Sequence, residues 1–71
     1  MENKIITRFN KNKKEIVQVT LNSYKGYDLV DIRVYVENDS GELIATKRGI
    51  SISTRLIPEL KKALEKAEQE L

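Results

Sequence analysis

The sequence predicts an α+β fold in which β-strands come first and a single helix comes last. Two stretches alternate apolar and polar residues with the period of a half-buried strand, and the final stretch changes to helical spacing. The 71 residues leave room for one domain. So short a chain buries only about 60% of its unfolded surface, so pairing with a second copy would help to complete its core.

Two runs separated by a polar loop predict the first strands. KIITRF, residues 4–9, is mainly β-branched and aromatic and is a candidate first strand. NKNKK, residues 10–14, is typical of a loop. EIVQVTLN, residues 15–22, alternates valine and leucine with glutamine, threonine and asparagine. This alternation predicts a strand with one apolar and one polar face.

Turn residues delimit the remaining strands. YKGY, residues 24–27, interrupts the alternation, because Gly26 is free to take a positive φ. DLVDIRVYVE, residues 28–37, alternates again, with aliphatic residues on one face and charged or aromatic residues on the other. NDSG is a turn. Further strand material follows in ELIATK and GISIS, and Gly49 between them predicts a bulge or a close backbone approach.

The last stretch is predicted to be an amphipathic helix. Ser53 or Thr54 is the expected N-cap, and Pro58 predicts a tight or irregular first turn. Apolar residues recur at spacings of three and four and form a helix seam, which comprises Ile57, Leu60, Leu64, Ala67 and Leu71. The sequence leaves open whether this seam only covers the apolar face of the sheet or also packs against a partner helix.

Positive charge is concentrated at the N-terminus. Residues 1–14 carry five basic side chains against one glutamate, a net charge of +4, while residues 15–55 and 56–71 each carry −1. A basic segment on a nearly neutral body suits an arm that is drawn to polyanions. A solubilising tail explains the charge equally well.

The composition argues against catalysis and against metal or cofactor binding. The chain has no cysteine and no histidine, which removes disulfides, thiolate ligands and the commonest general base. Asp28 and Asp31 are three apart and fall on opposite faces of a strand, and neither a phosphate-binding glycine loop nor a calcium-loop spacing is present. We therefore expect no enzyme, cofactor or metal. No apolar run approaches the roughly 20 residues of a membrane span, so we expect a soluble, intracellular protein without a membrane partner.

The order of the motifs resembles that of a known family. Between Ile16 and Leu64, YKG is followed by LVDIRVY, an acidic turn with SGEL, KRGISI and a helix. This order is similar to the DNA-binding domain of the transcriptional coactivator positive cofactor four and its bacterial and phage relatives. The resemblance implies a curved four-stranded antiparallel sheet followed by one C-terminal helix, paired into a symmetric homodimer. It also implies binding of single-stranded or melted DNA with little sequence preference.

The resemblance assigns binding roles to individual residues. Tyr24 matches the stacking aromatic of the family and Lys25 the cation beside it. Arg33 matches the arginine of the DIR element, and Lys47 and Arg48 match the basic pair before GIS.

Other positions depart from the family pattern or add to it. Tyr27 stands where the best-known members have a lysine, and it is expected to add stacking. The second stacking aromatic of the family falls on Val36, and Ile44 replaces a basic residue. Lys13 and Lys14 add charge from the N-terminal segment.

These observations lead to one interpretation and two rivals. We expect residues 1–14 to form a basic segment that includes a first strand, and residues 15–71 to form a domain that binds single-stranded DNA as a transcriptional coactivator or regulator, or in DNA maintenance. The transcription machinery is then a further partner. A prokaryotic or phage-like member is cytoplasmic and nucleoid-associated, whereas a eukaryotic one is nuclear. The rivals are a protein-interaction or dimerisation module and a protein that binds single-stranded RNA.

Overall fold

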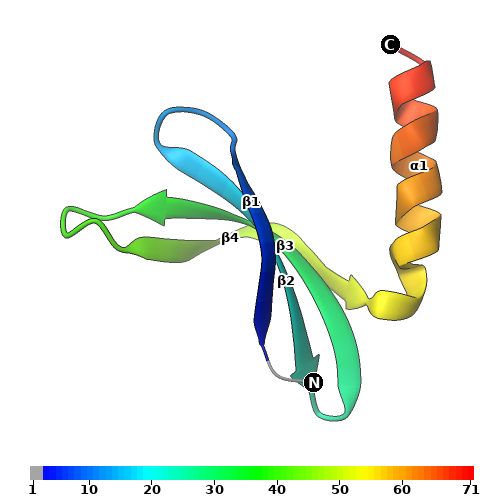
Figure 1. Ribbon diagram of the computed structural model, residues 1–71, viewed down its shortest axis with the longest axis horizontal. Coiled ribbons are helices and arrows are strands. Elements are labelled where there is room, and N and C mark those ends of the chain that lie inside the picture. Colours follow the sequence, from blue (N-terminus) through cyan, green and yellow to red (C-terminus); the bar gives the residue numbers. More distant parts are fainter. Residues whose placement is uncertain (1–2) are drawn as a thin grey trace.

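Four antiparallel strands followed by one helix make up the protein, as the sequence predicts. The computed structural model describes residues 3–71. The strands, in chain order, are β1 (Lys4–Asn10), β2 (Glu15–Tyr24), β3 (Tyr27–Glu37) and β4 (Leu43–Ser53). Their order in the sheet is the order in the chain, so the sheet is an open meander with β1 and β4 at its edges (Figure 1).

Two irregularities bend this sheet. The register between β1 and β2 shifts at residues 5–7, and the register between β3 and β4 shifts between Arg33 and Tyr35. Gly49 lies directly after the second shift, where an added Cβ would come within 2.5 Å of the Ile32 carbonyl oxygen. The predicted close backbone approach at Gly49 is therefore confirmed. ELIATK and GISIS prove to be parts of the single strand β4, because the bulge absorbs the interruption.

The strands give the sheet one apolar and one polar face, as the alternation predicts. Val17 pairs with Val34, and Val19 pairs with Ile32. Directly opposed residues share a face, so these pairs, with Leu21 and Val30, define the apolar face. The alternate positions define the polar face, which comprises Gln18, Thr20, Asn22, Tyr24, Tyr27, Asp31, Arg33 and Tyr35.

A short 3₁₀ turn, η1 (Thr54–Leu56), separates β4 from the helix α1 (Ile57–Gln69). The Ser53 hydroxyl accepts a hydrogen bond from the Arg55 backbone N–H at 3.3 Å, so it caps η1. The expectation that Ser53 or Thr54 caps the α-helix was wrong in this respect: Leu56 holds that position and makes no side-chain cap. Pro58 lies in the first turn of α1 and cannot donate to a preceding turn, in keeping with the tight entry expected there.

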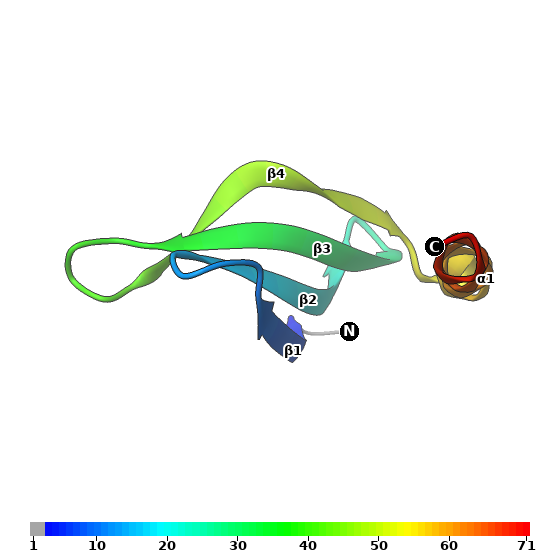
Figure 2. The same cartoon turned by 90° about the horizontal axis from the view of Figure 1, so that it is seen from above.

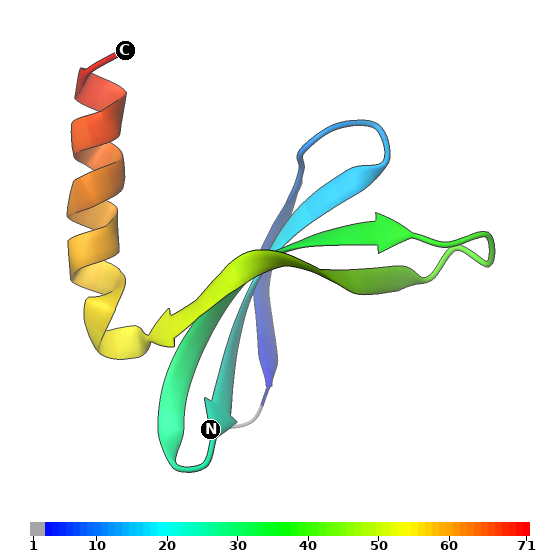
Figure 3. The same ribbon diagram turned by 180° about the vertical axis from the view of Figure 1, so that it is seen from behind.

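The helix stands beside the sheet and leaves most of its own surface open. Figures 1 and 3 show α1 leaving the end of β4 as a separate arm, and Figure 2 shows the sheet as one thin, bent layer. Val30, at 5% exposure, is the one buried apolar residue among residues 3–71, and no side chain in that range is completely enclosed. Within the same residues, no helix is long and apolar enough to cross a membrane.

An apolar hollow of about 290 Å³ lies between α1 and the apolar face. Leu21, Val30 and Ile32 line it from the sheet, and Ile57, Leu60 and Leu64 line it from the helix. Ile57 and Leu60 are half-buried, whereas Leu64, Ala67 and Leu71 are exposed. The sheet therefore half-buries the helix seam only at its beginning, and the seam is exposed from Leu64 onwards.

Candidate nucleic-acid interface

An exposed aromatic pair forms the tip of the β2–β3 hairpin. Lys25 and Gly26 have φ values of 50° and 83°, the two positive values of a type I′ turn. This tight turn places Tyr24 directly opposite Tyr27, and the two side chains are 61% and 70% exposed. The Lys25 ammonium lies 5.4 Å from the centroid of the Tyr24 ring, within cation–π range. Three of the predicted residues thus form one exposed platform of rings and charge.

Arg33 lies on the same polar face but is held in place by other groups. Its Nε and Nη2 donate to the two carboxylate oxygens of Asp31 at 3.1 and 2.8 Å, and its Nη1 donates to the Thr46 carbonyl oxygen at 3.0 Å. Asp31 stabilises the charged form and raises the pKa of Arg33 above its already high ordinary value. Arg33 therefore links β3 to the bulge in β4, and the remaining N–H groups of its guanidinium are free to donate to a ligand.

A second set of hydrogen bonds orders the polar face next to Arg33. Gln18, which pairs with Arg33 across the strands, is buried and accepts a hydrogen bond from Arg8 Nε at 2.6 Å. Its amide nitrogen lies 3.2 Å from the Thr20 hydroxyl. Within residues 3–71, no buried side-chain nitrogen or oxygen lacks a partner. The buried polar groups of this face are therefore all hydrogen-bonded.

Lys47 and Arg48 lie on the bulge of β4 and do not act as a pair. Lys47 is exposed. Arg48 forms a salt bridge with Glu15, at the start of β2, and lines a hollow with Val17, Ile32 and Ile50. These aliphatic residues belong to the apolar side of the sheet, as does Glu15, which pairs with Val36, so Arg48 makes its contacts on that side.

Glu15 receives several donors besides Arg48. The Lys11 ammonium lies 3.2 Å from Glu15 Oε1, and the Asn12 amide nitrogen lies 2.7 Å from the same oxygen. Arg48, Asn12 and Lys11 together lower the pKa of Glu15 from 4.5 to about 2. The carboxylate consequently stays charged over the whole physiological range.

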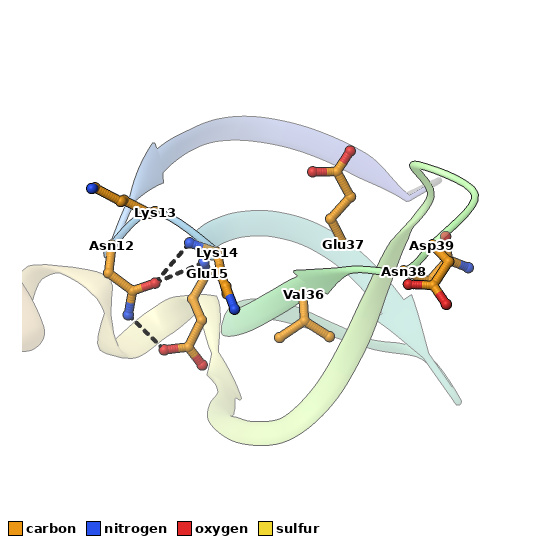
Figure 4. A pocket seen from close by; sticks show the side chains of 8 residues that line it. All are labelled: Asn12, Lys13, Lys14, Glu15, Val36, Glu37, Asn38 and Asp39. Atoms are coloured by element: carbon orange, nitrogen blue, oxygen red, sulfur yellow. Dashed lines mark hydrogen bonds between the residues drawn. The ribbon is translucent and has the colours of Figure 1, made fainter.

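Lys13 and Lys14 lie at the opposite end of the sheet from the tyrosine platform. They line a hollow of about 680 Å³ between the β1–β2 loop and the β3–β4 hairpin (the loop hollow, residues 12–15 and 36–39). Figure 4 shows Asn12 bonded to the residues that follow it in the loop, with Val36 and Glu37 across the hollow. Val36 pairs with Glu15 and Ile44 on the apolar side. The position of the second stacking aromatic in the family pattern therefore does not share a face with Tyr24.

The predicted residues are spread along the sheet and do not form a single cluster. The tyrosine platform lies at one end of β2 and Lys14 at the other, which are about 30 Å apart along ten strand residues. Within residues 3–71, no salt bridge involves Lys13, Lys14, Lys25 or Lys47, whereas both Arg33 and Arg48 are paired. Unpaired cations at both ends of the sheet, with aromatic rings at one end, suit an extended polyanion better than a small ligand.

The partners of the two arginines were missed in the sequence. Asp31 and Arg33 are two apart on one strand face, so the alternation carried a signal for their contact. Glu15 and Arg48 are 33 residues apart on strands that are not neighbours. No local pattern indicates that pair.

The fold and the surface together define a class: a small α+β module whose open, bent sheet presents cations and aromatic rings on one face. The sequence matches the family described as Transcriptional Coactivator p15 (PC4) over residues 11–63, most of the chain. The protein belongs to this family, as the order of its motifs predicted. A comparison with curated proteins gives no match.

Solved structures of two relatives have the same fold. One is BPSL1147, a PC4 homolog from Burkholderia pseudomallei, with a TM-score of 0.90 and 28% identity over 97% of this chain and 93% of that one. Its tetragonal crystal form gives a TM-score of 0.85 at 27% identity, over 94% and 98% of the two chains. The other is a bacteriophage T5 homolog of the eukaryotic coactivator PC4, implicated in recombination-dependent DNA replication. It has a TM-score of 0.65 and 23% identity over 99% of this chain and 76% of that one, a likeness of fold.

Proposed function

We propose that this protein binds single-stranded or melted DNA as a homodimer, with little sequence preference, in transcription or DNA maintenance. The observation that carries the proposal is the exposed pair of Tyr24 and Tyr27 with the Lys25 ammonium over one ring. Membership of a transcriptional coactivator family supports it.

The tyrosine platform supports binding of unpaired bases. A base stacked on an aromatic side chain contributes about 1–3 kcal/mol, and it does so for any base because every base has a π-face. In a duplex these faces are covered by neighbouring bases, so stacking on Tyr24 or Tyr27 requires a single or melted strand. The same argument predicts a preference for single-stranded over duplex DNA, with little dependence on the base sequence.

The unpaired lysines support contact with the phosphate backbone. Lys13, Lys14, Lys25 and Lys47 release counterions when they meet phosphates, with a slope of about 0.7 in log affinity against log salt for each phosphate on a single strand. Arg33 and Arg48 are already neutralised by carboxylates, so we expect them to add less to this slope.

The dimensions of the chain support a homodimer. Its radius of gyration is 13.7 Å, against about 11 Å for a compact domain of this length. Its accessible surface is 5960 Å², against about 4,500 Å² for a compact monomer of 8.2 kDa. The excess of about 1,500 Å² is nearly twice the roughly 800 Å² that each partner buries in a standard interface, so one chain exposes enough extra surface to form such an interface. The apolar hollow and the uncovered half of the helix seam are the surfaces that a second copy would cover.

One titration series separates this function from its rivals. A labelled oligo-dT strand, its matching duplex and an RNA strand of the same length are titrated by fluorescence anisotropy at two salt concentrations. We expect the DNA strand to bind more tightly than the duplex, and its affinity to fall as salt rises.

Each rival has its own result in the same series. Equal binding of strand and duplex would contradict base stacking. Tighter binding of the RNA strand would make RNA the ligand. No salt-dependent binding of any nucleic acid, from a folded protein, would favour a protein-interaction module built on the apolar hollow.

A further inference from the structure

Three donors converge on the carboxylate of Glu15. They are the Arg48 guanidinium from β4, the Lys11 ammonium and the Asn12 side-chain amide from the β1–β2 loop. The loop is itself fixed, because Asn12 Oδ1 accepts hydrogen bonds from the backbone N–H groups of Lys14 and Glu15, both at 2.9 Å. The donors are therefore arranged before any ligand arrives.

The same donors suit a phosphate. A guanidinium and an ammonium recognise carboxylate and phosphate oxygens through the same charge-assisted hydrogen bonds. The side chains of Arg48 and Lys11 remain 54% and 45% exposed, so solvent and ligands reach them. Lys13 and Lys14 lie in the same loop, and within residues 3–71 neither forms a salt bridge. The cluster thus has the donors, the access and the surrounding positive charge of a phosphate site.

We infer that Glu15 occupies, with its own carboxylate, a phosphate-binding site formed by Arg48, Lys11 and Asn12, and that a nucleic-acid phosphate enters only by displacing it. Glu15 acts as an internal competitor, so the affinity for a nucleic-acid strand is lower than it would be if Arg48 and Lys11 were free to bind phosphate. Because its pKa is held near 2, the competitor remains charged at every physiological pH. This inference rests on the proposed function and adds an inhibitory residue to it.

A pair of charge-matched variants tests the inference. Glu15→Gln removes the charge that holds Arg48, whereas Glu37→Gln removes one charge from the same loop hollow at a residue without a salt bridge within residues 3–71. Both raise the net charge by one, so general attraction of a polyanion changes equally. Oligo-dT affinity and its salt dependence are measured for both, after thermal unfolding has shown that both fold.

We expect Glu15→Gln to bind the strand about two- to fivefold more tightly than Glu37→Gln, the range that corresponds to release of one exposed ion pair. Its salt slope should also be steeper, by about 0.7 for each phosphate gained. Adding Arg48→Gln to Glu15→Gln should abolish both gains. If Glu15→Gln does not fold, Glu15→Asp withdraws the carboxylate from Arg48 by one methylene and should shift affinity in the same direction.

Equal affinities for the two charge-matched variants would overturn the inference and leave Glu15 as a structural tie between β2 and β4. Failure of the parent protein to bind oligo-dT would instead overturn the proposed function. In that case a titration with inorganic pyrophosphate, followed by NMR at the Asn12 side-chain amide, still decides the inference. Binding by Glu15→Gln at lower concentration than by the parent supports it, and equal binding overturns it.

Discussion

At the scale of single residues, the rings and the charges of the surface are carried by different side chains. Tyr24 presents an exposed ring that carries no formal charge, and Lys25 places a cation over that ring from the next position in the turn. Arg33, by contrast, is fixed by Asp31 and the Thr46 carbonyl group. Stacking and electrostatic attraction should therefore respond to different substitutions.

Tyr24→Ala is expected to weaken binding of a single strand by about 1–3 kcal/mol, because one stacking surface is lost. The salt slope should stay nearly unchanged, since no cation is removed. Tyr24→Phe keeps the ring and serves as the control, with affinity close to that of the parent. Anisotropy at several salt concentrations gives both quantities, and circular dichroism checks the fold. If folded Tyr24→Ala protein binds DNA as tightly as the parent, Tyr24 is not a stacking surface, and the β2–β3 hairpin is only a turn with exposed tyrosines.

The lowered pKa of Glu15 predicts a dependence of stability on pH. Its pKa is about 2 in the folded protein and 4.5 as an ordinary side chain, so the unfolded chain binds the proton more readily. The stabilisation by Glu15 is therefore complete above pH 4.5 and is lost as the pH falls through 2. Glu15→Gln should be less stable than the parent at neutral pH and should lose less stability between pH 4.5 and 2. The free energy of unfolding is measured for both proteins across this range. An equal loss of stability in the two proteins would contradict the lowered pKa of Glu15.

At the scale of elements, the bulge in β4 connects the shape of the sheet to its surface. The register shift opposite Val34 brings the Thr46 hydroxyl to 2.7 Å from the Val34 carbonyl oxygen, and it places the Thr46 carbonyl group within reach of Arg33. Gly49 allows β4 to rejoin β3 directly after the bulge, because any side chain there would overlap the Ile32 and Arg33 backbone. The bend and the position of Arg33 thus depend on one glycine.

Gly49→Ala is expected to destabilise the protein by about 3 kcal/mol, at the upper end of overpacking costs. The added Cβ would lie 2.5 Å from the Ile32 carbonyl oxygen and 2.8 Å from Arg33 Cα, which are backbone atoms that cannot move independently. Ser51→Ala, two residues further along β4 at an exposed position, is the control and should change stability by less than about 0.5 kcal/mol. Urea denaturation of the three proteins measures the difference, and equal midpoints would show that the strands separate easily at this point.

At the scale of the whole molecule, one chain does not enclose a core. The molecule measures 38 × 38 × 18 Å, and the apolar face of the sheet meets only the beginning of the helix. Leu64 lines the apolar hollow and is nevertheless 61% exposed. Burial of one leucine stabilises a fold by about 1.5–3 kcal/mol. A single chain that leaves several seam residues in water therefore forgoes a large part of the stability that is typical of a domain.

Leu64→Glu is therefore expected to dissociate the proposed dimer or to unfold it, because it places a charge in the interface. Sedimentation velocity at micromolar concentration should show a dimer for the parent and a monomer or unfolded chain for the variant. Gln69→Glu introduces the same charge on an exposed helix position outside the seam and should leave the dimer intact. A folded, monomeric parent at this concentration would contradict the proposal.

The sequence determined the elements and the faces of the sheet. The alternation from Ile16 to Val36 was sufficient to assign both faces of the two strands. Successive side chains of a strand point to opposite faces, so once the apolar residues are placed on one face, the others must lie on the opposite face. Gly26 identified the tight turn, and Gly49 the close approach. The order of YKG, LVDIRVY and KRGISI identified the family, and with it Tyr24 and Lys25 as neighbours in space.

Only the tertiary structure decided how the charges pair and where the helix lies. Lys47 and Arg48 are adjacent in the sequence, yet only Arg48 reaches across β3 to Glu15, on a strand that is not a neighbour of its own. The seam of Ile57 to Leu71 has the same pattern whether it covers its own sheet or a partner, and the 3₁₀ turn after β4 sets the direction of α1 away from the sheet. Local periodicity fixes which residues are neighbours along an element, whereas contacts between distant segments depend on bends and bulges that no short pattern encodes.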